Sequence, residues 1–297
     1  MSAPRSMARV IGARVGWTVW AIVPVLALAY HFGPGQRAFK EDLASEVITR
    51  AQSLQSEAVA AQSAAYEKHL VAITARRAAF GGDDPTLVAA AKLAGEAEDQ
   101  AYAIAGEKWQ RTADELGQAQ DLIQESDADL RNRVRLARAR ALVRAGDVGG
   151  GADDLESLLT TLGETGEADS ALGLEAREEL ATALYYGARL LRLAGKPGEQ
   201  WREVSGRARQ NFRYLAEHAR AVGNDAEAVA NHEKNGELVL NLEQSSLDEL
   251  SAKARPKDSP PGAGARLGEK RPGRRGRRPG DQPSNGAGMD GEIGQGW

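Results

Sequence analysis

The chain has 297 residues, a formal net charge of −4 and no cysteine. The lack of cysteine excludes disulfide bonds, zinc sites with cysteine ligands and cysteine nucleophiles. Aromatic residues make up only 5% of the chain, alanine is abundant and strand-forming runs are missing, so an all-α fold is predicted for residues 37–252.

The charge is unevenly distributed along the chain. Residues 1–36 carry +3, residues 253–297 carry +5, and the region between them therefore carries −12. Phosphate contacts supply most of the affinity of a protein for nucleic acid. We therefore do not expect the acidic middle region to bind nucleic acid, and only the C-terminal tail could contact polyanions.

An uncharged apolar segment lies within the basic N-terminal region. It runs from Val15 to Phe32, close to the minimum length of a helix that spans a bilayer. Trp17 and Trp20 suit the headgroup region, and Pro24 is better tolerated in a membrane helix than in a soluble one. The sequence predicts a transmembrane helix here, and with it a single-pass protein of the inner (cytoplasmic) membrane whose body is extracytoplasmic.

Two other interpretations of this segment stay open. Ala27-Leu28-Ala29 has the small-x-small form of a signal-peptidase site, so cleavage would release the remainder of the chain. The segment could also form a buried core helix.

The middle region is predicted to form a series of amphipathic helices. Gly81-Gly82 ends one helix, and Asp84 followed by Pro85 provides an N-cap and a first helical position. We predict helices over residues 37–79, 85–123, 127–146, 152–163, 169–195, 197–222, 224–243 and 246–253. The first two would form a long hairpin, residues 37–125, and the others a set of helical repeats, residues 126–252.

Apolar stripes indicate which faces of these helices are buried. The first helix carries a narrow stripe that could seat a coiled-coil partner, although two shorter helices are an alternative; the stripe consists of Phe39, Leu43, Val47, Ala51, Leu54 and Ala58. In the later helices, Leu180, Leu184 and Leu191 are expected to face Trp201 and Phe212 in the core. The opposite, solvent-facing sides are predicted to carry Glu178, Glu179, Arg189, Arg192, Arg207 and Arg209.

An Ala-Gly-polar motif recurs at the predicted hairpin turns, namely at Ala105-Gly106-Glu107, Ala145-Gly146-Asp147 and Ala194-Gly195-Lys196. Glycine at such a position supplies the left-handed residue that ends a helix. The segment from Ala141 to Asp147, followed by Ala152, Leu155, Leu158 and Leu159, resembles a tetratricopeptide repeat, and so does the segment from Tyr186 to Pro197 followed by Trp201 and Ala208. The 34-residue period of that family is not kept. The resemblance implies a superhelical scaffold that binds proteins or peptides in a concave groove.

No pattern of catalytic or metal-ligating residues is present. The four histidines lack metal-ligand spacing and are predicted to lie on the surface; they are His31, His69, His218 and His232. We therefore predict no catalytic, cofactor or metal site and no enzymatic activity, an enzyme whose site forms only in three dimensions being the remaining alternative. The larger aromatic residues are predicted to be core, with a ligand groove as the alternative; they are Trp109, Trp201, Phe212 and Tyr214.

The tail, residues 253–297, is rich in Pro, Gly and Arg and is predicted to be disordered. Five arginines could contact an anionic polymer; they are Arg271, Arg274, Arg275, Arg277 and Arg278. The sequence as a whole favours a membrane-tethered, non-enzymatic scaffold that binds an unidentified protein through its repeat-like surface. The alternative is a polyanion or cell-envelope binder that acts through the tail.

Overall fold

The structure, a computed structural model, describes most of the chain between residues 34 and 261. The described residues are 34–80, 84–223, 226–252, 256, 257 and 259–261, together with Ile22, Pro24, Val25, Leu28 and Tyr30. All regular secondary structure in these residues is helical, so the predicted all-α fold is confirmed.

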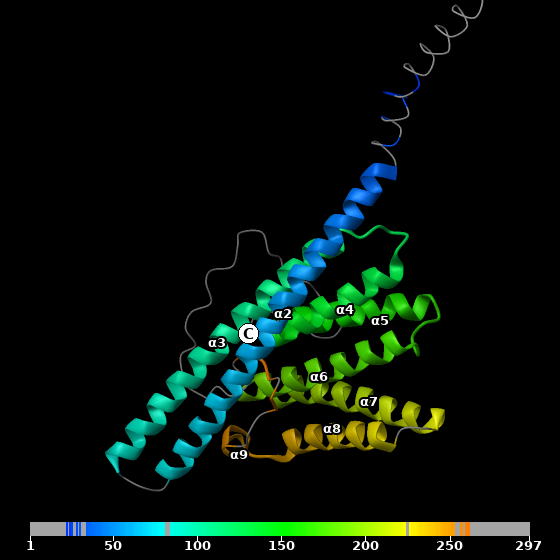
Figure 1. Ribbon diagram of the computed structural model, residues 1–297. Helices are drawn as coiled ribbons and strands as arrows, with labels where there is room; N and C mark the ends of the chain where they lie inside the picture. Colours follow the sequence, from blue (N-terminus) through cyan, green and yellow to red (C-terminus); the bar gives the residue numbers. More distant parts are fainter. Residues whose placement is uncertain are drawn as a thin grey trace, which may run out of the picture.

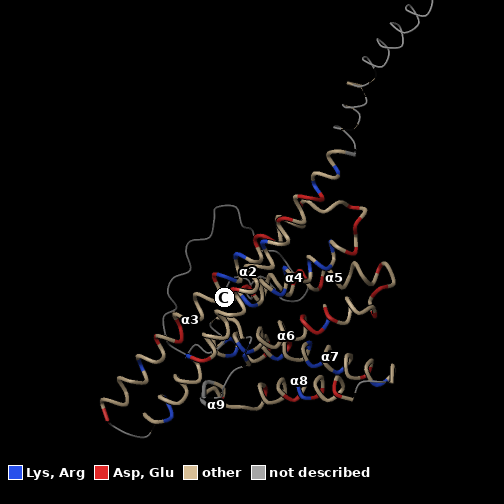
Figure 2. Tube along the Cα trace, in the orientation of Figure 1, with Lys and Arg blue, Asp and Glu red and all other residues tan. Residues whose placement is uncertain are grey.

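From α2 to α8, the helices form an array in which each one packs on the next in chain order (Figure 1). They are α2 (Pro34–Ala79), α3 (Pro85–Leu122), α4 (Ala128–Ala145), α5 (Val148–Glu164), α6 (Ala171–Leu193), α7 (Gly198–Val222), α8 (Ala226–Gln244) and the short α9 (Leu247–Ala252). The long pair α2–α3 crosses the shorter helices obliquely, and α6, α7 and α8 lie side by side (Figure 1). Acidic and basic residues are interspersed along α2, α3, α6 and α7, whereas α5 carries acidic residues and no Lys or Arg (Figure 2).

The N-terminal prediction requires a correction. Within the part of the chain that the structure describes, no helix is both long enough and apolar enough to cross a membrane. The predicted transmembrane helix and the single-pass location in the inner membrane are contradicted by this finding. The long helix α2 carries charged residues from Arg37 onward. Pro24 is helical and exposed, whereas Val15, Trp17, Trp20 and Phe32 lie outside the described residues.

The hairpin α2–α3 is held by a seam of alanines, of which only Ala51 and Ala58 belong to the predicted apolar stripe. Every seventh residue of α2 is an alanine that is at most 4% exposed, namely Ala44, Ala51, Ala58, Ala65 and Ala72. Such a period keeps one face of a helix against its partner, and the small side chain allows a close approach. The buried residues of α3 that form the other side include Tyr102, Ala105 and Trp109. The coiled-coil partner predicted for α2 is thus α3 itself, although Phe39 at the start of α2 remains 67% exposed.

The glycine-containing turns are only partly as predicted. Gly146 ends α4 with a φ of 101°, in the left-handed region that glycine favours. Gly106, by contrast, lies inside the continuous helix α3 and forms no turn. Helix α5 begins at Val148, earlier than predicted, because Asp147 caps it by accepting a hydrogen bond from the Gly150 amide. The glycine run is therefore helical, and it lets α5 approach α4: a Cβ added to Gly151 would lie 2.5 Å from a methyl group of Val143.

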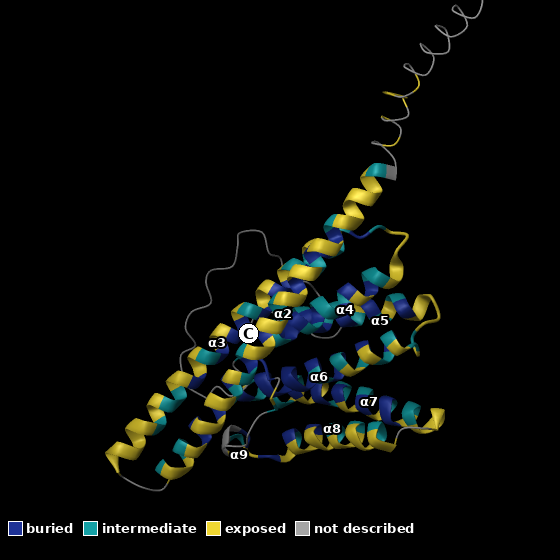
Figure 3. Cartoon of the chain, viewed as in Figure 1, coloured by how far each residue is buried: buried dark blue, intermediate teal, exposed yellow. Residues whose placement is uncertain are grey.

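The main core is formed by the helices from α4 to α9. It contains the residues of α6 and α7 that the apolar stripes predicted. Leu184 is fully buried, and Trp201 and Phe212 are almost so. Helix α6 is buried over most of its circumference, whereas the end of the α2–α3 hairpin near Phe80 is exposed (Figure 3). Helix α6 is buried in this way because it packs against α4, α5 and α7.

Several charged residues that were predicted to face solvent are covered. Arg189 is 3% exposed and donates a hydrogen bond to the carbonyl oxygen of Leu250, at 2.8 Å. Arg192 donates to main-chain carbonyl groups at the end of α8, and Arg207 forms an ion pair with Glu156 of α5. The prediction was wrong at these three residues because α6 and α7 have packed neighbours on more than one side.

The beginning of the predicted disordered tail returns to the helices. Ser259 and Pro260 are fully buried, and Pro261 is partly buried. We call Pro256, Lys257, Ser259, Pro260 and Pro261 the return segment. These residues at the start of the predicted tail contact the helices, and residues 262–297 lie outside the described part of the chain.

Candidate functional site

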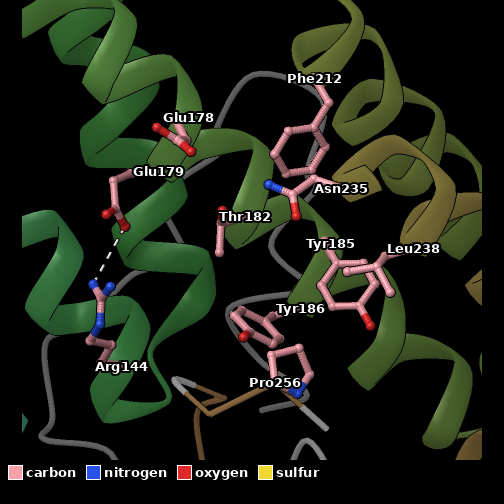
Figure 4. A pocket seen from close by; sticks show the side chains of 10 residues that line it. All are labelled: Arg144, Glu178, Glu179, Thr182, Tyr185, Tyr186, Phe212, Asn235, Leu238 and Pro256. Atoms are coloured by element: carbon pink, nitrogen blue, oxygen red, sulfur yellow. Dashed lines mark hydrogen bonds and ion pairs between the residues drawn. The ribbon is translucent and has the colours of Figure 1, made fainter. Parts of the chain in front are cut away.

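A cavity of about 250 Å³ opens on the side of the array where α4, α6 and α8 come together. Helix α6 supplies half of its lining residues, and α7 and the return segment complete the wall (Figure 4). The lining residues are Arg144, Glu178, Glu179, Thr182, Tyr185, Tyr186, Phe212, Asn235, Leu238 and Pro256. Alternate helices of the array thus contribute to one shared surface.

The periodicity of α6 explains why its side chains converge on this cavity. Glu178, Thr182 and Tyr185 follow one another at intervals of four and three residues, which places them on one helical face. Tyr185 and Tyr186 lie edge to face, with ring centroids 5.3 Å apart. Pro256 of the return segment lies beside Tyr186 (Figure 4). The cavity therefore has an aromatic wall that can contact an apolar group.

The opposite wall of the cavity is charged. Glu179 of α6 pairs with Arg144 of α4 at 3.4 Å and with Arg140 at 2.6 Å, and Arg140 also pairs with Glu175 at 2.6 Å. Burial of Arg140 opposes its charge, yet the two glutamates outweigh that effect and raise the pKa of its guanidinium group above the ordinary value. Arg144 and Glu179 of this network line the cavity, so a ligand there meets charged and aromatic groups together.

A second recess, the Pro-Pro cleft, lies between the hairpin α2–α3 and the C-terminal end of α4. It is formed by Gln62, Gly106 and Gly146, and the return segment fills it. The Nε2 atom of Gln62 donates hydrogen bonds to the carbonyl oxygens of Ser259, at 2.7 Å, and Lys257, at 3.3 Å. No feature of the sequence marked Gln62, because the cleft depends on residues that are about 200 positions apart.

The remaining aromatic candidates lie in different surroundings. Trp109 and Trp201 are core residues, whereas Phe212 is buried and also lines the cavity. Tyr214 is partly buried, and the Arg177 guanidinium group lies 4.2 Å from the centre of its ring. The arginines that were proposed to contact polyanions, Arg271, Arg274, Arg275, Arg277 and Arg278, lie outside the described residues.

Buried ionisable groups form one further cluster, inside the hairpin α2–α3. His69, predicted to lie on the surface, is 3% exposed and contacts Glu98, which also accepts a hydrogen bond from Arg76. Among the described residues, no three His, Cys, Asp or Glu side chains are arranged to hold a metal ion.

Comparisons with models of protein families, with curated proteins and with solved structures found no match for this chain. The class of the protein is therefore defined by its own architecture, an all-α array of antiparallel helices.

Proposed function

We propose that the protein is a non-enzymatic interaction scaffold, similar to tetratricopeptide repeats, that binds a protein partner at the cavity between α4, α6 and α8. The single observation that carries this proposal is the composition of the cavity. It combines the aromatic rings of Tyr185 and Tyr186 with the charged groups of Arg144 and Glu179 on one surface built from alternate helices. Aromatic and arginine side chains are the residue types that dominate protein interfaces.

The repeat-like arrangement supports the proposal from a second direction. The hairpins α4–α5 and α6–α7 follow one another, and the first helix of each hairpin contributes to the cavity. Helix α8 extends the same surface through Asn235 and Leu238. In helical-repeat proteins this geometry creates an extended binding surface from small contributions of many repeats.

Site-specific crosslinking in cells tests the proposal. A photoreactive amino acid replaces Thr182, which is partly buried in the cavity wall, or Gln210, an exposed residue on α7 that serves as the matched control. We expect a discrete crosslinked partner from position 182 and none from position 210. Thr182→Arg should abolish capture of that partner by a second crosslinker at Asn235, with an unchanged melting temperature. Equal crosslinking at positions 182 and 210 would contradict the proposal.

The alternative, binding of a polyanion through the tail, depends on Arg271, Arg274, Arg275, Arg277 and Arg278. Replacing all five with glutamine separates the two functions. If the cavity is the binding surface, the crosslink at position 182 persists in this variant. If the tail is responsible, the crosslink disappears and retention on a polyanionic resin falls as well.

A further inference from the structure

We infer that the Pro-Pro cleft is a binding site for extended peptides of the Ser-Pro-Pro type, and that the return segment occupies it as an intramolecular ligand. This inference rests on the proposed function and adds to it both a class of ligand and a means of self-inhibition. The cleft is separate from the polar wall of the cavity, although Pro256 belongs to the return segment and also lines the cavity.

The cleft contacts the peptide backbone of the return segment. Gln62 is 5% exposed, and its amide group donates to the carbonyl oxygens of both Lys257 and Ser259. Hydrogen bonds to main-chain carbonyl groups depend on the path of the peptide and hardly on its side chains. A buried amide in this position therefore selects a peptide segment whose backbone follows the same path as the return segment.

The absence of a side chain at Gly106 leaves space for a proline ring in the cleft. Gly106 is buried on α3, and a Cβ added there would lie only 2.7 Å from Cγ of Pro261. The C-cap residue Gly146 is the other close neighbour, with its added Cβ 3.6 Å from Cδ of Pro261. Gly106 thus leaves the volume that one proline ring fills, and Gly146, whose left-handed conformation favours glycine, lies in ordinary contact with the same ring.

The buried polar groups of the return segment do not need hydrogen-bond partners from the cleft beyond Gln62. Proline has no main-chain N–H, so Pro260 can be fully buried without leaving a donor unsatisfied. The hydroxyl group of Ser259 donates to the carbonyl oxygen of Pro256, at 2.8 Å, which satisfies it within the segment. A Ser-Pro-Pro sequence is therefore compatible with burial in the cleft, whereas residues with an N–H in place of the prolines would need new partners.

Because the return segment belongs to the same chain, it competes with any external peptide at a high effective concentration, on the order of millimolar for a short linkage. The experiment therefore compares the native full-length chain with a full-length variant that carries Pro260→Ser and Pro261→Ser. The probe is a fluorescent nine-residue peptide with the sequence of residues 255–263, and binding is followed by fluorescence anisotropy. We expect the peptide to bind the variant at least about tenfold more tightly than the native chain.

Controls address the shape of the cleft. Adding Gly106→Ala to the variant should abolish binding, because the new Cβ would clash with the proline ring. Gly117→Ala on the same helix should not, since its Cβ would meet only the Arg138 side chain, at 3.5 Å. A peptide with serine in place of both prolines should not bind. Circular dichroism establishes that each variant is folded.

A cysteine pair provides a second readout if the proline variant does not fold. The chain has no cysteine of its own, so Gly106→Cys combined with Pro261→Cys creates one possible disulfide. We expect this disulfide to form within the monomer under oxidising conditions, because residue 261 lies against Gly106 of α3.

Three results would overturn the inference. They are failure of the peptide to bind the folded proline variant, unchanged binding after Gly106→Ala, and a disulfide that links two copies of the chain. Failure of peptide binding with a persistent crosslink at Thr182 would refute the inference and leave the proposed function standing. Peptide binding without any crosslinked partner at Thr182 would count against the proposed function instead.

Discussion

The Nδ1 atom of His69 on α2 lies 2.8 Å from the Oε1 atom of Glu98 on α3, and both side chains are almost fully buried. The other carboxylate oxygen of Glu98 accepts a hydrogen bond from Arg76, at 2.7 Å. A buried carboxylate is costly unless it is paired. Glu98 therefore joins the two helices at one particular register, within a seam that is otherwise made mainly of small apolar residues.

Removal of this carboxylate should destabilise the hairpin. We expect Glu98→Leu to reduce the free energy of unfolding by about 3 kcal/mol, because Arg76 and His69 would lose their buried partner. Glu98→Gln keeps a hydrogen-bonding group and should cost less. Urea unfolding followed by circular dichroism measures both. Glu96→Gln, at an exposed position of the same helix, is the control and should have little effect; a Glu98→Leu variant as stable as this control would refute the proposed role.

The indole of Trp201 should be a major source of stability for the core. It is 7% exposed, and the guanidinium groups of Arg192 and Arg202 lie 4.7 and 4.8 Å from the centre of its ring. We expect Trp201→Ala to cost about 3–5 kcal/mol, measured by thermal or urea unfolding. Arg133→Ala, at an exposed position of α4, should change stability little. A melting temperature unaltered by Trp201→Ala would show that this stripe is not core.

Two glycines of α5 should respond in opposite directions to the same substitution. Gly151→Ala places a Cβ 2.5 Å from Val143 and 2.8 Å from the carbonyl oxygen of Ala139, so we expect a loss of about 1–3 kcal/mol from overpacking. Gly163→Ala meets nothing within 4 Å and should stabilise the helix by about 0.5–1 kcal/mol. The melting temperatures of the two variants should therefore fall on either side of the native value, and equal shifts would contradict the close α4–α5 packing.

Asp154 should titrate above the ordinary range of an aspartate. Burial raises its pKa from the usual 3.8, while Arg138 and Arg135 lower it by a smaller amount. Because the folded chain then holds this proton more strongly than the unfolded chain, the contribution of Asp154 to stability is greatest below pH 3.8 and declines as the pH rises through the folded-state pKa. Carboxyl-carbon NMR measures the shift. Arg138→Ala should raise the pKa further, and a pKa at or below 3.8 would disprove the effect.

The local sequence determined the helices of this protein and most of their ends. The N-cap residue Asp84 and the left-handed Gly146 act through bonds to residues a few positions away. The apolar stripe through Trp201 and Phe212 likewise follows from the helical period alone. For these features the interacting groups are neighbours along the chain, so the order of residues is enough to predict them.

Only the tertiary structure decided which polar groups are buried and what occupies the Pro-Pro cleft. Arg189 and His69 carry the residue types of a solvated helix face, and they are buried because a helix distant in sequence covers them. Gln62 meets Ser259 across 197 positions of the chain, and no local pattern encodes that meeting. The free energy of such contacts depends on how whole helices pack, because burial and pairing of a polar group are properties of its three-dimensional surroundings and not of its place in the sequence.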